Sequence, residues 1–181
     1  MGYGIHKLTF SAEEAYRYQI YNGTGRLRYQ AERLDARLPL PTYRVRFLDP
    51  AGSAIAQLSA LEENPWIFER TYLLRMAGTT GPDYVIRREW PFVDEALLRL
   101  PHYYVELGPR IYLAHGSRYG QHFYSIHRLQ DGAVVGEILR PTSGYHYWIE
   151  TEAPVLQQAP LLLVALVVVI DMEWEMVLER A

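Results

Sequence analysis

Residues 161–170 read LLLVALVVVI, ten apolar residues without a break. Pro154 and Pro160 precede this run, and Pro160 suits the first turn of a helix, where the missing N–H of proline costs nothing. A helix that is apolar on every face has to be buried on every face. The run therefore predicts a hydrophobic helix over about 158–172, enclosed by the rest of the domain.

Two other structures remain open for the same residues. A buried strand is compatible with a run that is rich in valine. A membrane span needs about 20 apolar residues, and a run of ten that follows Gln157 and Gln158 is short for one, so we expect no transmembrane span. The residues expected to form the core helix are Leu161, Leu162, Leu163, Val164, Leu166, Val167, Val168 and Ile170.

The chain before this run alternates between apolar and polar residues with period two, which is typical of half-buried strands. Turn sequences interrupt the alternation. Asn22-Gly23-Thr24-Gly25 is one of them, because asparagine and glycine tolerate positive φ. Short helices are expected at Ser11–Ala15 and 92–100. The expected strands are 3–10, 16–21, 26–32, 43–47, 54–61, 66–76, 84–90, 102–107, 111–115, 121–129, 133–140 and 145–151.

About twelve strands would expose many aggregation-prone edges unless the sheet closes or pairs with a second sheet. The sequence therefore predicts a mainly β (α+β) fold, either a barrel or a two-sheet sandwich. A barrel lined by apolar side chains also provides the enclosure that the C-terminal helix needs. We expect residues 1–181 to form a single domain, a closed antiparallel barrel around that helix.

The composition excludes several classes of function. The 181 residues include no cysteine, which rules out disulfides, thiolate metal sites and cysteine nucleophiles. The net charge of −3 gives no general attraction to nucleic acid, and we expect no nucleic-acid partner. The first residues lack the apolar region of a signal peptide, so we expect a cytoplasmic protein that is soluble or peripheral to a membrane.

Residues 43–52, YRVRFLDPAG, form a strand that enters an acidic-glycine turn, and Leu161 to Met172 form the expected core helix. With the hairpin at 16–32, these segments resemble the tubby C-terminal-like superfamily, and within it the LURP-one-related group, which is similar to phospholipid scramblases. The resemblance implies a twelve-stranded barrel around a central C-terminal helix. Tubby proteins bind phosphoinositides through basic side chains, which cannot be matched here one by one. Scramblase activity is not supported, because this chain lacks cysteine-rich segments and a separate membrane helix.

Arginines that share strand faces are candidate ligands for phosphate or a lipid head group. Arg26 and Arg28 form one pair and Arg44 and Arg46 another, and a third group precedes Trp90 at Arg87 and Arg88. A simpler interpretation is that these arginines lie on solvated outer faces. They would then pair with Glu32, Glu69 or Glu89.

Histidines give the alternative site. His115, His122, His127 and His146 fall in neighbouring strand candidates, and His115, His122 and His146 could converge on a metal ion. His122 and His127 are five residues apart and should point to opposite faces. The competing interpretation is scattered surface or hydrogen-bonded histidines.

No G-x-S-x-G, P-loop or G-x-G-x-x-G motif is present, and of the carboxylate pairs only Glu150 and Glu152 share a face. Asp171 ends the apolar run, and we expect it to reach solvent at the barrel mouth rather than to pair with an arginine of the wall. Trp174, Met176 and Val177 would then plug the opening.

The sequence as a whole predicts a non-enzymatic binding or scaffolding protein without a cofactor. Its partner would be an anionic phospholipid or phosphoinositide surface, or another protein. The alternative is a small β-barrel metal-binding protein or enzyme that uses clustered histidines.

Overall fold

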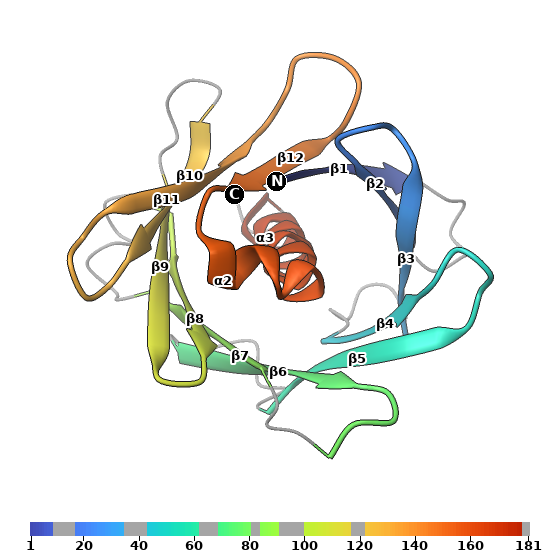
Figure 1. The fold of residues 1–181 in the computed structure, drawn as a ribbon, viewed down its shortest axis with the longest axis horizontal. Helices are drawn as coiled ribbons and strands as arrows, with labels where there is room; N and C mark the ends of the chain where they lie inside the picture. Colours follow the sequence, from blue (N-terminus) through green and yellow to red (C-terminus); the bar gives the residue numbers. More distant parts are fainter. Residues whose placement is uncertain are drawn as a thin grey trace.

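The computed structural model describes residues 1–8, 17–34, 43–61, 69–80, 84–90, 100–116 and 122–178, with the side chains of His122 and 174–178 excepted. Twelve antiparallel strands close into one barrel, and two helices follow (Figure 1). The elements are β1 (Gly2–Leu8), β2 (Arg17–Asn22), β3 (Leu27–Arg33), β4 (Arg44–Leu48), β5 (Ala54–Ala60), β6 (Glu69–Met76), β7 (Tyr84–Glu89), β8 (His102–Leu107), β9 (Arg110–Gly116), β10 (His122–Arg128), β11 (Val134–Leu139), β12 (Tyr147–Thr151), α2 (Pro154–Gln157) and α3 (Pro160–Leu178).

The strands follow one another around the barrel in sequence order, and β1 closes the ring against β12. In that closing pair Gly2 lies opposite Glu150, and Ile5 lies opposite Tyr147. The predicted closed antiparallel barrel of twelve strands with a C-terminal helix is confirmed, and the two-sheet sandwich is not observed. The two short helices expected at Ser11–Ala15 and 92–100 fall on residues outside the described ones, apart from Leu100.

Local sequence chemistry explains the hairpins. The Asn22 side-chain Oδ1 accepts hydrogen bonds from the backbone N–H groups of Thr24 (3.2 Å) and Arg26 (2.9 Å), and Gly25 adopts a φ of 76°. This conformation is open to glycine at no steric cost. Period-two alternation then turns apolar residues inward, as in β6, where Tyr72 and Leu74 are fully buried.

Helix α3 runs through the middle of the barrel (Figure 1). No residue from Leu161 to Glu173 is more than 4% exposed. Its bounds differ from the expected 158–172 at both ends. Because Pro160 has no N–H to donate, α2 ends at Gln157 and α3 starts afresh at Pro160. At its other end the helix continues to Leu178, past Asp171 and Glu173, which both find partners inside the barrel.

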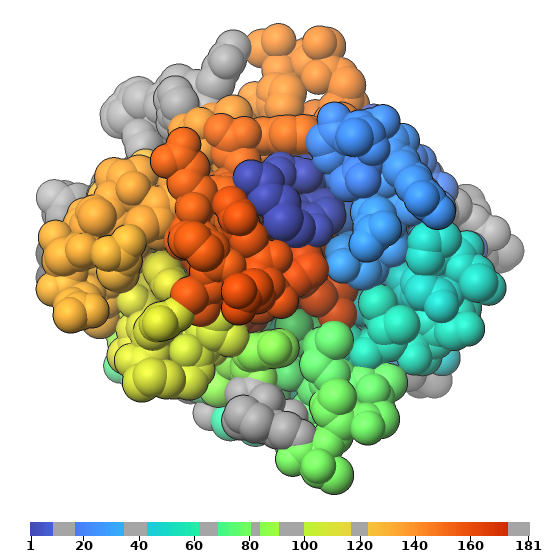
Figure 2. Space-filling model, in the orientation of Figure 1, coloured from blue at the N-terminus to red at the C-terminus, as the bar shows by residue number. Residues whose placement is uncertain are grey.

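One end of the barrel carries α2, the N-terminus and the hairpin turns of β8–β9 and β10–β11; we call it the α2 end (Figure 1). In the space-filling view, α2 and the first residues of α3 fill the centre of this end (Figure 2). None of the helices among the described residues combines the length and apolarity needed to cross a membrane.

Candidate functional site

The densest group of ionisable side chains lies inside the barrel, around the C-terminal half of α3. Arg70 on β6 and Arg88 on β7 lie directly opposite each other and both point inward. Glu173 lies between them, with Oε1 2.8 Å from Arg70 Nη1 and Oε2 2.7 Å from Arg88 Nη1. The Tyr72 hydroxyl also donates to Glu173. One carboxylate therefore offsets two like charges that would otherwise repel across the strand pair.

Asp171, two residues before Glu173 on α3, forms a second buried group. It accepts hydrogen bonds from the hydroxyls of Tyr18 (2.8 Å) and Tyr147 (2.7 Å) and lies 3.0 Å from Lys7 Nζ. The expectation that Asp171 reaches solvent at the barrel mouth is wrong, because the residue is only 4% exposed. Inward-facing donors on three strands satisfy the carboxylate within the barrel. The proposed plug of Trp174, Met176 and Val177 rests on side chains outside the described ones.

The environment shifts the pKa of the tyrosines and of the lysine in these two groups. Burial, and then the neighbouring carboxylate, raises the pKa of Tyr18 and of Tyr72 well above the usual value, so both remain neutral donors. Burial lowers the pKa of Lys7, although Asp171 opposes this effect. The two groups connect α3 to β1, β2, β6, β7 and β12.

These buried groups have no room for a substrate within the described part of the barrel. The cavity beside Glu173 measures about 10 Å³ and is bounded by Arg88, Tyr103 and Tyr124 among others. Such a space holds one water at most. We therefore interpret the two groups as anchors that fix α3 in the barrel.

A groove of about 640 Å³ lies at the α2 end, where α2 meets two hairpin turns. This volume falls within the usual range for ligand sites, about 300–1,000 Å³. The residues that line the groove are Pro109, Arg110, Ile111, Tyr112, Arg128, Leu129, Gln130, Ala153, Pro154 and Val155.

The groove combines cationic and apolar groups. Arg110 is exposed, and Arg128 contacts Asp131 with Nη1 2.8 Å from Oδ2. Leu129 is 49% exposed, and Val155 on α2 is half-buried. A guanidinium beside exposed apolar surface fits an amphiphilic anion. Neither Arg110 nor Arg128 was singled out from the sequence, because only the folded chain brings their two turns to α2.

The six arginines predicted as ligands do not gather in one place. Arg44 and Arg46 are exposed on the outer wall of β4, where Arg46 Nε lies 2.6 Å from Glu32 Oε1. Arg87 lies outside, with Nε 3.3 Å from Glu89 Oε1, whereas Arg88 lies inside with Glu173. The predicted pairing with Glu32 and Glu89 is thus confirmed for Arg46 and Arg87.

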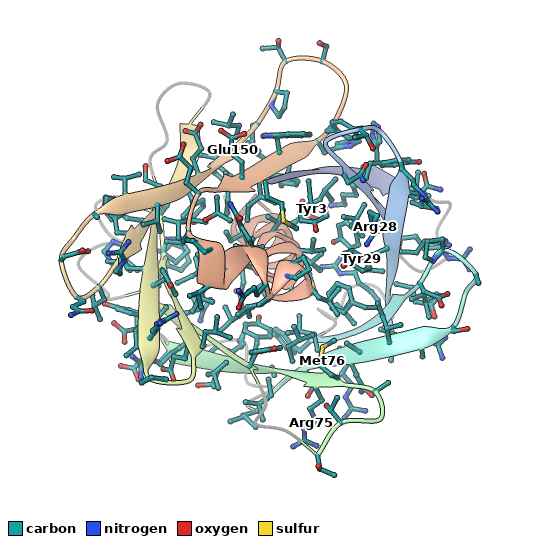
Figure 3. All side chains as sticks on the ribbon, in the orientation of Figure 1. Tyr3, Arg28, Tyr29, Arg75, Met76 and Glu150 are labelled. Atoms are coloured by element: carbon teal, nitrogen blue, oxygen red, sulfur yellow. The ribbon has the colours of Figure 1, made fainter. Side chains whose placement is uncertain are left out.

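Arg26 and Arg28 do not share a strand face as expected. Arg26 precedes β3, and a register shift places Tyr29 opposite Ile20 but Leu27 opposite Tyr21. Arg28 is therefore the extra residue of a β-bulge, which re-aims its side chain. Figure 3 shows Arg28 on the helix side of β3, close to Tyr3 and Tyr29 at the α2 end.

The histidines predicted as metal ligands are also dispersed. His115 lies on the outer face of β9, and β10 and β11 separate it from His146, which precedes β12. His146 Nδ1 accepts a hydrogen bond from the Lys7 backbone N–H (3.2 Å), and burial followed by the neighbouring His6 lowers its pKa. Within the described ranges, no three His, Cys, Asp or Glu side chains are arranged to hold a metal ion. The side chain of His122 lies outside those ranges.

Comparison with models of protein families, with curated proteins and with solved structures gave no match for this chain.

Proposed function

We propose that this chain is a non-enzymatic binding protein that docks through its α2 end on surfaces of anionic phospholipid. The observation that carries the proposal is the division of the molecule into a filled interior and an amphiphilic groove outside. The proposed location is cytoplasmic and peripheral to the membrane.

The interior supports binding on the outside. From Leu161 to Glu173 the helix takes up the space that an enzyme or a lipid-carrying barrel would leave for its ligand. The 10 Å³ cavity beside Glu173 is too small for any organic ligand.

Exposed apolar residues favour the α2 end as the docking face. Four large hydrophobic residues are exposed in the described part of the chain: Met1, Leu61, Leu129 and Val134. Leu129 and Val134 flank the β10–β11 turn, and the Met1 carbonyl accepts a hydrogen bond from Thr151, just before α2. Three of the four therefore lie at this end, where they could enter the acyl boundary of a bilayer.

Positive side chains at the same end supply the second attraction. Arg110 and Arg128 line the groove, and Arg26 and Arg28 follow the neighbouring β2–β3 turn. Guanidinium groups bind phosphate by paired hydrogen bonds, and anionic lipid attracts each by about 1 kcal/mol near the surface. Membership of the tubby C-terminal-like superfamily, proposed on residues 43–52 and 161–172, fits the same ligand class.

The test is co-sedimentation with liposomes of phosphatidylcholine alone, with added phosphatidylserine, and with added phosphoinositide. We expect binding to the two anionic compositions only, weakened by salt. The double variant R110Q/R128Q should lose most of it. The matched control R44Q/R46Q removes the same charge from the wall of β4 and should bind as the unmodified chain does.

If the two double variants lost liposome binding equally, the attraction would come from the overall charge of the protein and not from the groove. Binding that survives R110Q/R128Q, or no binding to any anionic liposome, would refute the proposal.

A further inference from the structure

Two histidines, His102 and His115, face each other on the outer wall of the barrel, and neither lines the groove of the proposed function. Tyr103 on β8 pairs with Ala114 on β9, and both point inward. The next step of the same ladder brings His102 opposite His115 on the outer face. Their ring centroids are 4.8 Å apart, with an angle of 65° between the rings.

This separation matches that of two imidazoles bound to one metal ion. A metal–nitrogen bond of about 2.0–2.1 Å places each ring centroid roughly 3.2 Å from the metal. Two such rings are then about 4.5 Å apart at a ligand angle of 90° and about 5.2 Å apart at the tetrahedral angle. The observed 4.8 Å lies between these limits.

The strands on either side supply compatible neighbours. Glu89 on β7 lies opposite His102, and Ser125 on β10 lies opposite His115. Arg87 Nε lies 3.3 Å from Glu89 Oε1, so this carboxylate is already engaged. Because no three His, Cys, Asp or Glu side chains of the described residues form a ready metal site, the other positions on the ion would belong to water.

We propose that His102 and His115 form a two-imidazole site for a divalent transition metal such as Zn²⁺, Ni²⁺ or Cu²⁺. The site is independent of the groove at the α2 end and differs from the dispersed set of His115, His122 and His146. Imidazole favours these ions over Mg²⁺ and Ca²⁺, which prefer oxygen ligands, and Cu²⁺ should bind more tightly than Ni²⁺ or Zn²⁺.

Isothermal titration calorimetry with Ni²⁺ and with Zn²⁺ tests the site. We expect one ion per chain, and a loss of about 100-fold in affinity for His102→Ala or for His115→Ala, since a single imidazole lacks the effective concentration of the second. His127→Ala is the matched control, because His127 lies on the adjacent strand β10 with Nδ1 3.3 Å from the Gly132 carbonyl oxygen. This control should bind as the unmodified chain does.

Paramagnetic Ni²⁺ or Cu²⁺ gives a second readout that does not depend on affinity. Amide resonances of β8 and β9 near His102 and His115 should broaden first, while those around Arg110 and Arg128 in the groove remain sharp. Circular dichroism establishes that each variant folds. Absence of binding, binding by either histidine variant as tight as that of the unmodified chain, or broadening centred elsewhere would overturn the proposal.

Discussion

Glu173 belongs to a group in which two buried arginines share one carboxylate. Arg70 is 0% exposed and Arg88 is 5% exposed, so water cannot compensate either charge if Glu173 is lost. A broken buried ion pair is costly because the remaining charge has neither solvent nor partner. The same chemistry on the surface contributes little.

We therefore expect Glu173→Gln to lower the free energy of unfolding by about 3–5 kcal/mol. The matched control is Glu32→Gln, which removes the partner of the exposed Arg46 and should cost no more than about 1 kcal/mol. Urea unfolding followed by circular dichroism measures both. Similar losses in the two variants would show that the interior group does not anchor α3.

At the scale of elements, close backbone contacts decide which strands can pair. Gly136 on β11 faces Thr151 on β12, and a Cβ added to Gly136 would lie 2.5 Å from the Glu150 carbonyl oxygen. That atom belongs to the backbone of a paired strand and cannot move without disturbing the ladder. Gly23, in the β2–β3 turn, has no atom nearer than 4.0 Å to the same added Cβ.

Gly136→Ala should therefore destabilise the protein by about 1–3 kcal/mol, as other overpacked sites do. Gly23→Ala makes the same chemical change where there is space, and it should cost much less. Thermal unfolding of the two variants gives the comparison. An unaffected Gly136→Ala protein would contradict the close pairing of β11 with β12.

Helix α3 provides a second test at this scale. Val167 is 0% exposed among the barrel side chains, whereas Val134 is 64% exposed at the α2 end. Val167→Asp places an unpaired charge in a dry core, and we expect no folded protein from it. Val134→Asp makes the same change in water and should fold normally. Soluble yield and circular dichroism distinguish them, and a folded Val167→Asp protein would refute the enclosed position of the helix.

At the scale of the whole molecule, the barrel and its helix share one set of buried tyrosines. Burial raises the pKa of Tyr18, Tyr72 and Tyr103 well above the ordinary value and raises that of Tyr147 as well. The folded state keeps these protons at pH values where the unfolded chain, with tyrosine pKa values of about 10, releases them. The resulting stability is fully present below about pH 10 and is lost as the pH rises above it.

Urea unfolding at a series of pH values from about 8 to about 11 should thus show stability falling most steeply above about pH 10. Lys7 acts in the opposite direction, because its lowered pKa makes the unfolded chain bind more protons, but it is one group against several tyrosines. Phenolate absorbance should show the buried tyrosines titrating only as the protein unfolds. Titration of every tyrosine in the folded state would contradict the prediction.

The filled interior determines where on the molecule a ligand can bind. Because the helix occupies the barrel, the described residues offer a ligand the α2 end and the outer wall. The groove with Arg110 and Arg128 and the pair His102 and His115 are on separate parts of the surface. The two proposals can therefore fail independently.

The strands, the hairpin turns and the helix could all be predicted from the sequence, because their signals are local. Alternation with period two determines which residues of a strand can face a core. A helix of ten successive apolar residues has no polar face to turn to water, so it has to be buried on all sides. The strand bounds observed differ from the expected ones by three residues at most at any described end. The closed barrel followed from the need to pair the edges of so many strands.

The sites were decided by tertiary structure, because they depend on register between distant segments. Arg70 forms an ion pair with Glu173, which is 103 residues away in the sequence. The groove brings α2 together with the β8–β9 and β10–β11 turns. Alternation alone placed Arg28 on the same strand face as Arg26, and this was wrong. Arg28 is the extra residue of a bulge, and a bulge turns the side chain of its extra residue in a new direction. Local patterns give each residue a face, but only closure of the ring determines which residues meet.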